Sequence, residues 1–195
     1  MSKKPSHFWL DFVACFLIPA YTLLFAGSVE WFGTNFSVIA VTGPDHYRGF
    51  VYWGILAGSY FFVMLSKLAF VLPLRWERVV VRLLTVCAVL SLAYAVAIPY
   101  LPAYFPKYAA LHVALAAGAC VLLMLALLTV LLALRRTDPA RWRRPLRGWG
   151  LIVAGSAVLF LIPMMVSTAL EVFFTISAAL LARRVWLLLN TDKYL

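Results

Sequence analysis

Apolar residues dominate this chain in long runs that short polar or basic stretches separate. A run of about 17–25 apolar residues is long enough for a helix to cross a bilayer. The run over 148–189 has twice that length, and Pro163, Ser167 and Thr168 interrupt it near the middle. Because these residues are typical of a turn, we divide the run into two spans. The six predicted spans lie at 9–28, 49–73, 79–99, 108–134, 148–165 and 167–189.

The runs are continuous, which favours helices over the short alternating segments of a membrane β-barrel. A backbone in lipid must also satisfy its own hydrogen bonds, and a helix does so within one segment. The sequence therefore predicts an all-α integral membrane protein, a bundle of six transmembrane helices in a single domain over 1–195. Composition agrees, since 65% of the residues are hydrophobic and only 12% are charged. Soluble domains are about half apolar and a quarter charged, so a water-soluble enzyme, a disordered chain and a small secreted disulfide domain are excluded.

The basic residues predict the orientation, because Lys and Arg gather on the cytoplasmic side of membrane proteins. Fifteen of the 17 lie at the termini, near the end of the second span, or in the links after the second and fourth spans. We expect both termini in the cytoplasm and a bacterial cytoplasmic (inner) membrane. The fifteen are Lys3, Lys4, Lys67, Arg75, Arg78, Arg82, Arg135, Arg136, Arg141, Arg143, Arg144, Arg147, Arg183, Arg184 and Lys193.

The net charge of +10 follows from this topology and from attraction to anionic lipids of the inner leaflet. The basic residues lie in short loops without a recognition fold, so no nucleic-acid partner is expected. Membrane lipids are the expected partners, and partner subunits or a homo-oligomer stay open. The link 135–147 also contains Thr137-Asp138-Pro139, which is typical of a helix start. We predict a short basic helix at the membrane surface there.

A charge inside a span is costly and indicates function. Apart from the arginines already assigned to the cytoplasmic side, the candidates are Asp11, Lys67, His112 and Glu171. Asp11 and Lys67 lie near cytoplasmic span ends and are interpreted as groups that reach the interface. Glu171 and His112 lie at similar depths in the outer half, one near the start of span six and one near the start of span four. They are the main candidate ligand-binding residues. The alternative is a structural pair that locks the bundle.

The outer loop 29–48 supplies the remaining candidates. Its apolar centre, 36–41, is too short to cross a membrane and is expected to lie back on the bundle as a lid or re-entrant segment. Gly43-Pro44-Asp45-His46 is typical of a turn. We expect the loop to hold polar side chains at the rim of an outward-facing site, although they would also suit a solvated loop. These candidates are Glu30, Asp45, His46 and Arg48.

The sequence predicts no metal site and no cofactor. The histidines His7, His46 and His112 are widely separated, and the three cysteines form no Cys-x-x-Cys pair. Phosphate-binding loops and nucleophile elbows are also missing from the sequence. Catalytic residues stay unknown, and whether the chain is an enzyme stays open.

Three short segments resemble the DRAM and GPI-lipid-remodelling family of six-span membrane proteins. They are the outer segment Ser37-Val-Ile-Ala-Val-Thr-Gly-Pro-Asp45, His112 followed by small residues, and Thr168-Ala-Leu-Glu-Val172. That family tends to place an aromatic residue directly after the glutamate, where this chain has Val172 before two phenylalanines. The resemblance implies a lipid-related role at the outer leaflet.

Three functions fit these observations. The first is binding of a lipid or small amphiphile in an outward-facing polar pocket with Glu171 and His112 at its base. The second is a membrane-embedded enzyme that modifies a lipid and uses Glu171 or His112 as general acid or base. The third is a substrate-capture subunit of a transporter.

Overall fold

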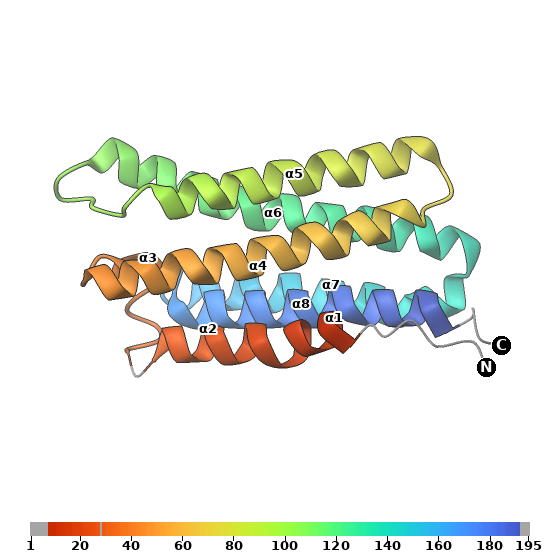
Figure 1. Ribbon diagram of the computed structural model, residues 1–195, viewed down its shortest axis with the longest axis horizontal. Helices are drawn as coiled ribbons and strands as arrows, with labels where there is room; N and C mark the ends of the chain where they lie inside the picture. The colour runs from red at the N-terminus through yellow and green to blue at the C-terminus, as the bar shows by residue number, and fades with distance from the viewer. Residues whose placement is uncertain (1–7, 28, 192–195) are drawn as a thin grey trace.

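The computed structural model describes residues 8–27 and 29–191. All regular elements in these residues are helices, which run up and down in an antiparallel bundle (Figure 1). Lys3, Lys4, His7, Ser28 and Lys193, to which the sequence predictions refer, lie outside the described residues. In chain order the elements are α1 (Phe8–Phe12), the π-helix η1 (Val13–Leu17), α2 (Ile18–Ala26), α3 (Phe36–Ala40), α4 (Pro44–Phe70), α5 (Arg75–Ala97), α6 (Pro106–Thr137), α7 (Pro139–Leu161) and α8 (Thr168–Thr191).

Five helical segments are long and apolar enough to cross a membrane, which supports an integral membrane protein. They are Phe8–Ala26, Pro44–Phe70, Arg75–Ala97, Pro106–Thr137 and Thr168–Asn190. The helix α7 has 23 residues and is not among them. Its N-terminal part carries Arg141, Arg143, Arg144 and Arg147, which lower its hydropathy.

Large apolar side chains lie on the outer surface of the bundle. Leu24 is 80% exposed, and Phe70 and Leu151 are each 71% exposed. A soluble monomer rarely exposes apolar surface on this scale. These side chains fit a bundle whose outside faces lipid.

Two segments differ from their predicted form. The predicted turn Gly43-Pro44-Asp45-His46 is the start of α4, because Pro44 occupies a first-turn position, where its missing N–H costs nothing. The prediction of a separate surface helix in 135–147 is wrong. The helix α6 runs to Thr137, and α7 begins at Pro139 after Asp138, which caps it by accepting a hydrogen bond from the Arg141 N–H at 3.1 Å. The turn predicted within 148–189 lies between Leu161 and Thr168, as expected.

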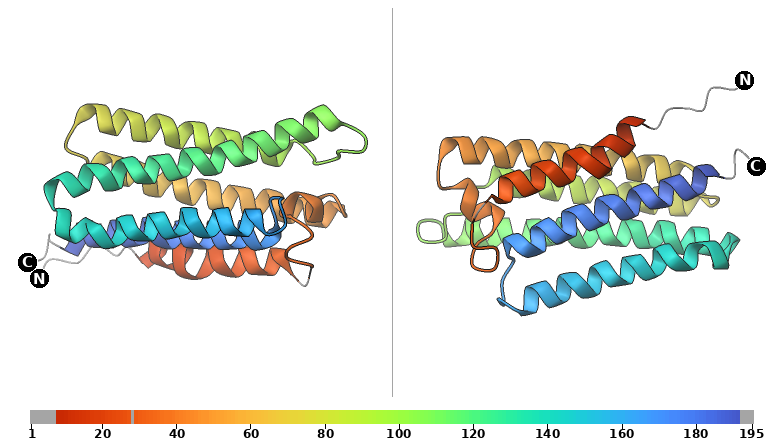
Figure 2. Two further views of the ribbon diagram at one scale, coloured as in Figure 1. Left: turned by 180° about the vertical axis from the view of Figure 1, so that it is seen from behind. Right: turned by 90° about the horizontal axis from the view of Figure 1, so that it is seen from below.

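The two ends of the bundle have different characters. One end, here called the α3 end, holds α3 and the α5–α6 and α7–α8 connections (Figure 1). The other, the basic end, holds the α4–α5 and α6–α7 connections, and α1 begins and α8 ends toward it (Figure 2). Most of the predicted cytoplasmic cations in the described residues belong to elements that meet at the basic end.

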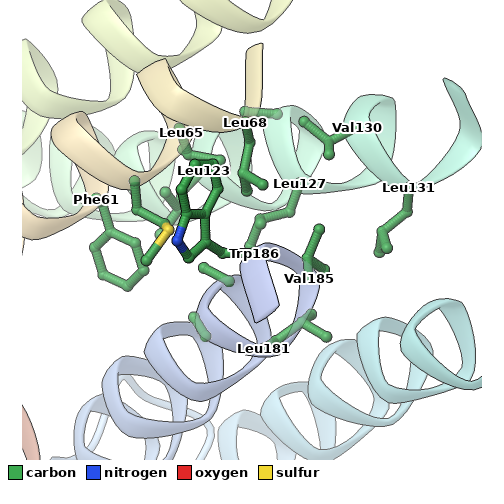
Figure 3. Close-up of a cluster of buried hydrophobic side chains, with 14 of the residues drawn as sticks. Phe61, Leu65, Leu68, Leu123, Leu127, Val130, Leu131, Leu181, Val185 and Trp186 are labelled. Carbon is green, nitrogen blue, oxygen red and sulfur yellow. The ribbon is translucent and has the colours of Figure 1, made fainter. Parts of the chain in front are cut away.

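The larger core fills the bundle between α4, α6 and α8. Leu65, Leu68, Leu127 and Val185 are fully buried there, and Trp186 extends from α8 between α4 and α6 (Figure 3). At the basic end of this core, Arg136 Nη1 of α6 donates a hydrogen bond to Glu77 Oε1 of α5 at 2.6 Å. The Glu77 side chain is only 1% exposed, whereas that of Arg136 is 60% exposed. This ion pair ties the α5–α6 hairpin together.

Candidate functional site

The short helix α3 lies back on the bundle, as the apolar centre of the outer loop predicts. Asn35 caps it, since its Oδ1 accepts a hydrogen bond from the Val38 N–H at 2.9 Å. Phe36 is fully buried, and Ile39 is 7% exposed. A five-residue helix has little stability of its own, so contacts with the bundle hold α3 in place.

Glu171 of α8 binds the first turn of α3. The Phe36 N–H donates to Glu171 Oε2 at 2.6 Å. The first-turn N–H groups of a helix have no partner within it. A short hydrogen bond to a carboxylate is among the stronger ones in proteins. Glu171 therefore satisfies a backbone donor that Asn35 does not reach.

His112 of α6 binds the next residue of α3. Ser37 Oγ and His112 Nε2 are 2.6 Å apart, and His112 Nδ1 lies 2.8 Å from the Ile98 carbonyl oxygen. A carbonyl can only accept, so Nδ1 carries the proton. In the neutral ring Nε2 then accepts from the Ser37 hydroxyl. His112 is 3% exposed and joins α3, the end of α5 and α6.

The loop before α3 caps α8 in return. The N–H of Thr168 donates to the Thr34 carbonyl at 2.7 Å, and the N–H of Ala169 donates to the Trp31 carbonyl at 3.0 Å. Asn35 Nδ2 adds a hydrogen bond to the Val166 carbonyl at 3.3 Å. Thus α8 supplies a hydrogen-bond acceptor to the first turn of α3, and the loop before α3 supplies acceptors to the first turn of α8.

Aromatic rings continue inward from α3. The Phe36 ring packs edge-on against Trp53 of α4, with 5.1 Å between centroids. Trp53 also stacks on Phe50 and donates from Nε1 to the Thr22 hydroxyl at 3.2 Å. These contacts form an aromatic layer beneath α3.

A cavity of about 60 Å³ begins at this layer. Its walls come from α4, α5, α6 and α8 and are mostly apolar, with Thr175 and Cys120 as the polar exceptions. The cavity is partly open, and Cys120 on the outer side of α6 is one of its lining residues. The lining residues are Trp53, Ala57, Gly58, Phe61, Ala88, Val89, Leu92, Ala119, Cys120, Leu123, Phe174 and Thr175.

The structure thus brings Glu171 and His112 to one short segment, on consecutive residues of α3, and gives no direct contact between them. Ser167 and Thr175, which share the Glu171 face at a spacing of four residues, are both buried. Thr175 lines the cavity one turn inward from Glu171. That spacing in the sequence is the signal that connects Glu171 to the cavity.

The predicted rim residues lie apart from these contacts. Asp45 and Arg48 pair with each other at 3.3 Å on the first turns of α4, and both are largely exposed. His46 Nδ1 lies 2.6 Å from the Thr42 hydroxyl beside the end of α3. The exposed Glu30 carboxylate lies against Gly33, in the turn that leads to α3.

Sequence reasoning did not identify Phe36, Ser37 or Trp53 as site residues. Every residue except proline has a backbone N–H, so a sequence does not indicate which one is buried and bound by a side chain. A serine in an apolar loop is also too common to indicate a site. The run of apolar residues over 36–41 and the resemblance carried by 37–45 marked this segment, but not these individual residues.

His112→Ala is expected to lower the free energy of unfolding by about 1–3 kcal/mol, because it leaves the Ile98 carbonyl and the Ser37 hydroxyl without a partner. Unfolding by SDS in mixed micelles would measure this loss. His46→Ala, at an exposed histidine, should change stability by less than about 0.5 kcal/mol. Equal losses in the two variants would contradict the structural role of His112.

No protein-family model matches this chain, and no curated protein or solved structure matches it. The resemblance to the DRAM and GPI-lipid-remodelling family therefore stays a prediction.

Proposed function

We propose that this chain is a six-span protein that binds a lipid or small amphiphile at the α3 end of its bundle. The alkyl part would occupy the cavity between α4, α5, α6 and α8, and the polar part would lie near Glu171. In this proposal α7 is the sixth span, both termini face the cytoplasm, and the α3 end faces outward. The apolar cavity directly beneath the anchored α3 carries the proposal.

The position of α7 supports the sixth span. It runs antiparallel to α8 along the bundle (Figure 2). From Gly148 to Leu161 it contains no charged residue, and its arginines lie at the basic end. The same end holds the α4–α5 connection with Arg75 and Arg78, in agreement with a cytoplasmic location.

The lining of the cavity favours an apolar guest. Apolar cavities stay dry and take up apolar molecules of matching shape. In this proposal the partly open cavity meets the surface of α6 beside Cys120. In a membrane, that surface meets acyl chains, so a chain could enter without passing through water.

The carboxylate of Glu171 supports a polar contact above the cavity. Its Oε2 is occupied by the Phe36 N–H, whereas Oε1 has no hydrogen-bond partner among the described residues. A hydroxyl or ammonium group of an amphiphile could donate to Oε1. His112 uses both ring nitrogens within the chain, so its role here is to hold α3.

Photolabelling of the cavity, with and without a side chain that fills it, tests the proposal. A photoreactive alkyl amphiphile, such as a diazirine fatty alcohol, should label the lining segments of α4, α6 and α8 in the detergent-purified protein. Ala119→Leu projects added methyl groups into the cavity and should reduce this labelling severalfold. Peptide mass spectrometry would locate and quantify the labelled residues.

Ala117→Leu is the matched control, since Ala117 is exposed on the same helix and should leave the labelling unchanged. Labelling that spreads evenly over the outer surface, or that is insensitive to Ala119→Leu in a variant that unfolds like the wild type, would reject the cavity as the binding site.

A further inference from the structure

A second group of polar residues lies toward the basic end, where α1, α4 and α8 approach one another. Arg183 Nε of α8 donates to Asp11 Oδ1 of α1 at 2.8 Å. Lys67 of α4 holds its ammonium nitrogen 5.5 Å from the centre of the Trp186 ring. The proposed function uses none of these residues.

The backbone of the first span is irregular at this point. Asp11 lies two residues before η1, at whose end the Ile18 N–H reaches back five residues to the Val13 carbonyl. Such single π-helical turns are rare and frequently occur at functional sites. The segment η1 packs against α8, so the widened turn and the Asp11–Arg183 pair both join the first span to α8.

The pairing leaves part of Arg183 available. Asp11 accepts from Nε, while Nη1 and Nη2 have no hydrogen-bond partner among the described residues. The Arg183 side chain is 28% exposed and that of Asp11 is 34% exposed. Asp11 therefore fixes the plane of the guanidinium, and the two terminal nitrogens remain as donors. Two parallel donors of this kind match two oxygens of a phosphate.

Lys67 adds a second cation against the same stretch of α8. Arg183 and Trp186 are three residues apart on α8 and so lie on one face, and the Lys67 ammonium lies against that Trp186 ring. Lys67 is exposed, and no carboxylate of the described residues lies within salt-bridge distance of it. Two cations with one carboxylate leave this group with a net positive charge.

We propose that Lys67 and Arg183 bind the phosphate of an anionic lipid headgroup in the leaflet at the basic end, with Asp11 as the positioning residue. The site lies on the outside of the bundle, between elements that contact lipid. It is separate from the cavity near α3, so either proposal can fail without the other. The Trp186 ring is largely buried and holds the Lys67 ammonium through a cation–π contact.

Native mass spectrometry of the full chain, released from nanodiscs of mixed phosphatidylglycerol and phosphatidylcholine, tests this site. The wild type should retain phosphatidylglycerol in preference to phosphatidylcholine. Lys67→Gln and Arg183→Gln should each lower that preference about fivefold, the effect of one basic residue near an anionic surface. Asp11→Asn should lower it less, because the cations remain.

Arg184→Gln is the matched control, because it removes an exposed cation from the neighbouring position of α8. An equal loss in Arg184→Gln would mean bulk charge attraction and would overturn the proposal. Unchanged retention in Lys67→Gln, which breaks no ion pair among the described residues, would also overturn it. A third arm adds inorganic phosphate to the protein in pure phosphatidylcholine. If the protein retains inorganic phosphate as well as it retains phosphatidylglycerol, the site binds a free anion and not a lipid headgroup.

Discussion

Arg136→Ala is expected to lower the free energy of unfolding by about 3 kcal/mol, since removing one partner of a buried ion pair costs about 3–5 kcal/mol. The variant leaves the buried Glu77 carboxylate without a cation, and Glu77 Oε2 already has no partner among the described residues. The lower end of the range applies because Arg136 itself is 60% exposed and water screens part of the interaction. SDS-induced unfolding in mixed micelles would measure the loss.

A double variant tests whether the loss of stability comes from the unpaired Glu77 carboxylate or from the loss of the ion pair itself. Glu77→Leu combined with Arg136→Leu should recover to within about 1 kcal/mol of the wild type, because buried ion pairs are often replaceable by apolar residues. Arg135→Ala removes the neighbouring exposed arginine and should have almost no effect. If Arg135→Ala and Arg136→Ala destabilise equally, the loss comes from helix charge and the buried pair is not its source.

Glu171→Ala is expected to release α3 from the bundle and to cost about 1–3 kcal/mol, the range for leaving a buried hydrogen-bond donor without an acceptor. The Phe36 N–H would lose its acceptor while the Phe36 ring stays in an apolar layer. Hydrogen–deuterium exchange should therefore accelerate at residues 36–40. Glu171→Gln keeps a carbonyl oxygen in reach of the amide and should show a smaller acceleration.

Glu30→Ala provides the comparison, because it removes an exposed carboxylate from the same outer loop. Its exchange at 36–40 should match that of the wild type. Unchanged exchange in Glu171→Ala would show that apolar packing alone retains α3, and the assigned role of Glu171 would be lost.

The sequence was sufficient to predict a helical membrane protein, because apolar runs of crossing length have few other structures available. It also pointed to Glu171 and His112, since a polar group in such a run needs a partner. The partners themselves could not be predicted. One is a backbone amide and the other a serine hydroxyl, and both depend on how α3 folds back.

Other features were hidden because their sequence signals are ambiguous. Glu77 lies among arginines and so resembles a solvated loop residue, yet it is buried. Gly43-Pro44 suits both a turn and a helix start, and the structure uses it as a helix start. Helix α7 shows a similar ambiguity, as its arginines reduce hydropathy in a segment whose second half is apolar. The π-helical turn in the first span has no recognisable sequence pattern.

The mutual capping of α3 and α8 has a consequence for the order in which the molecule assembles. The carbonyls of Trp31 and Thr34 and the amide of Phe36 find their partners in residues more than 130 positions later in the chain. During synthesis this early segment must wait for α8, and until then its polar backbone has only water or lipid headgroups to bind. Closing so long a loop is a slow step in folding. Assembly of the α3 end should therefore be among the last events, so that a nascent chain lacking α8 would carry an unfinished first hairpin, open to chaperones or proteases.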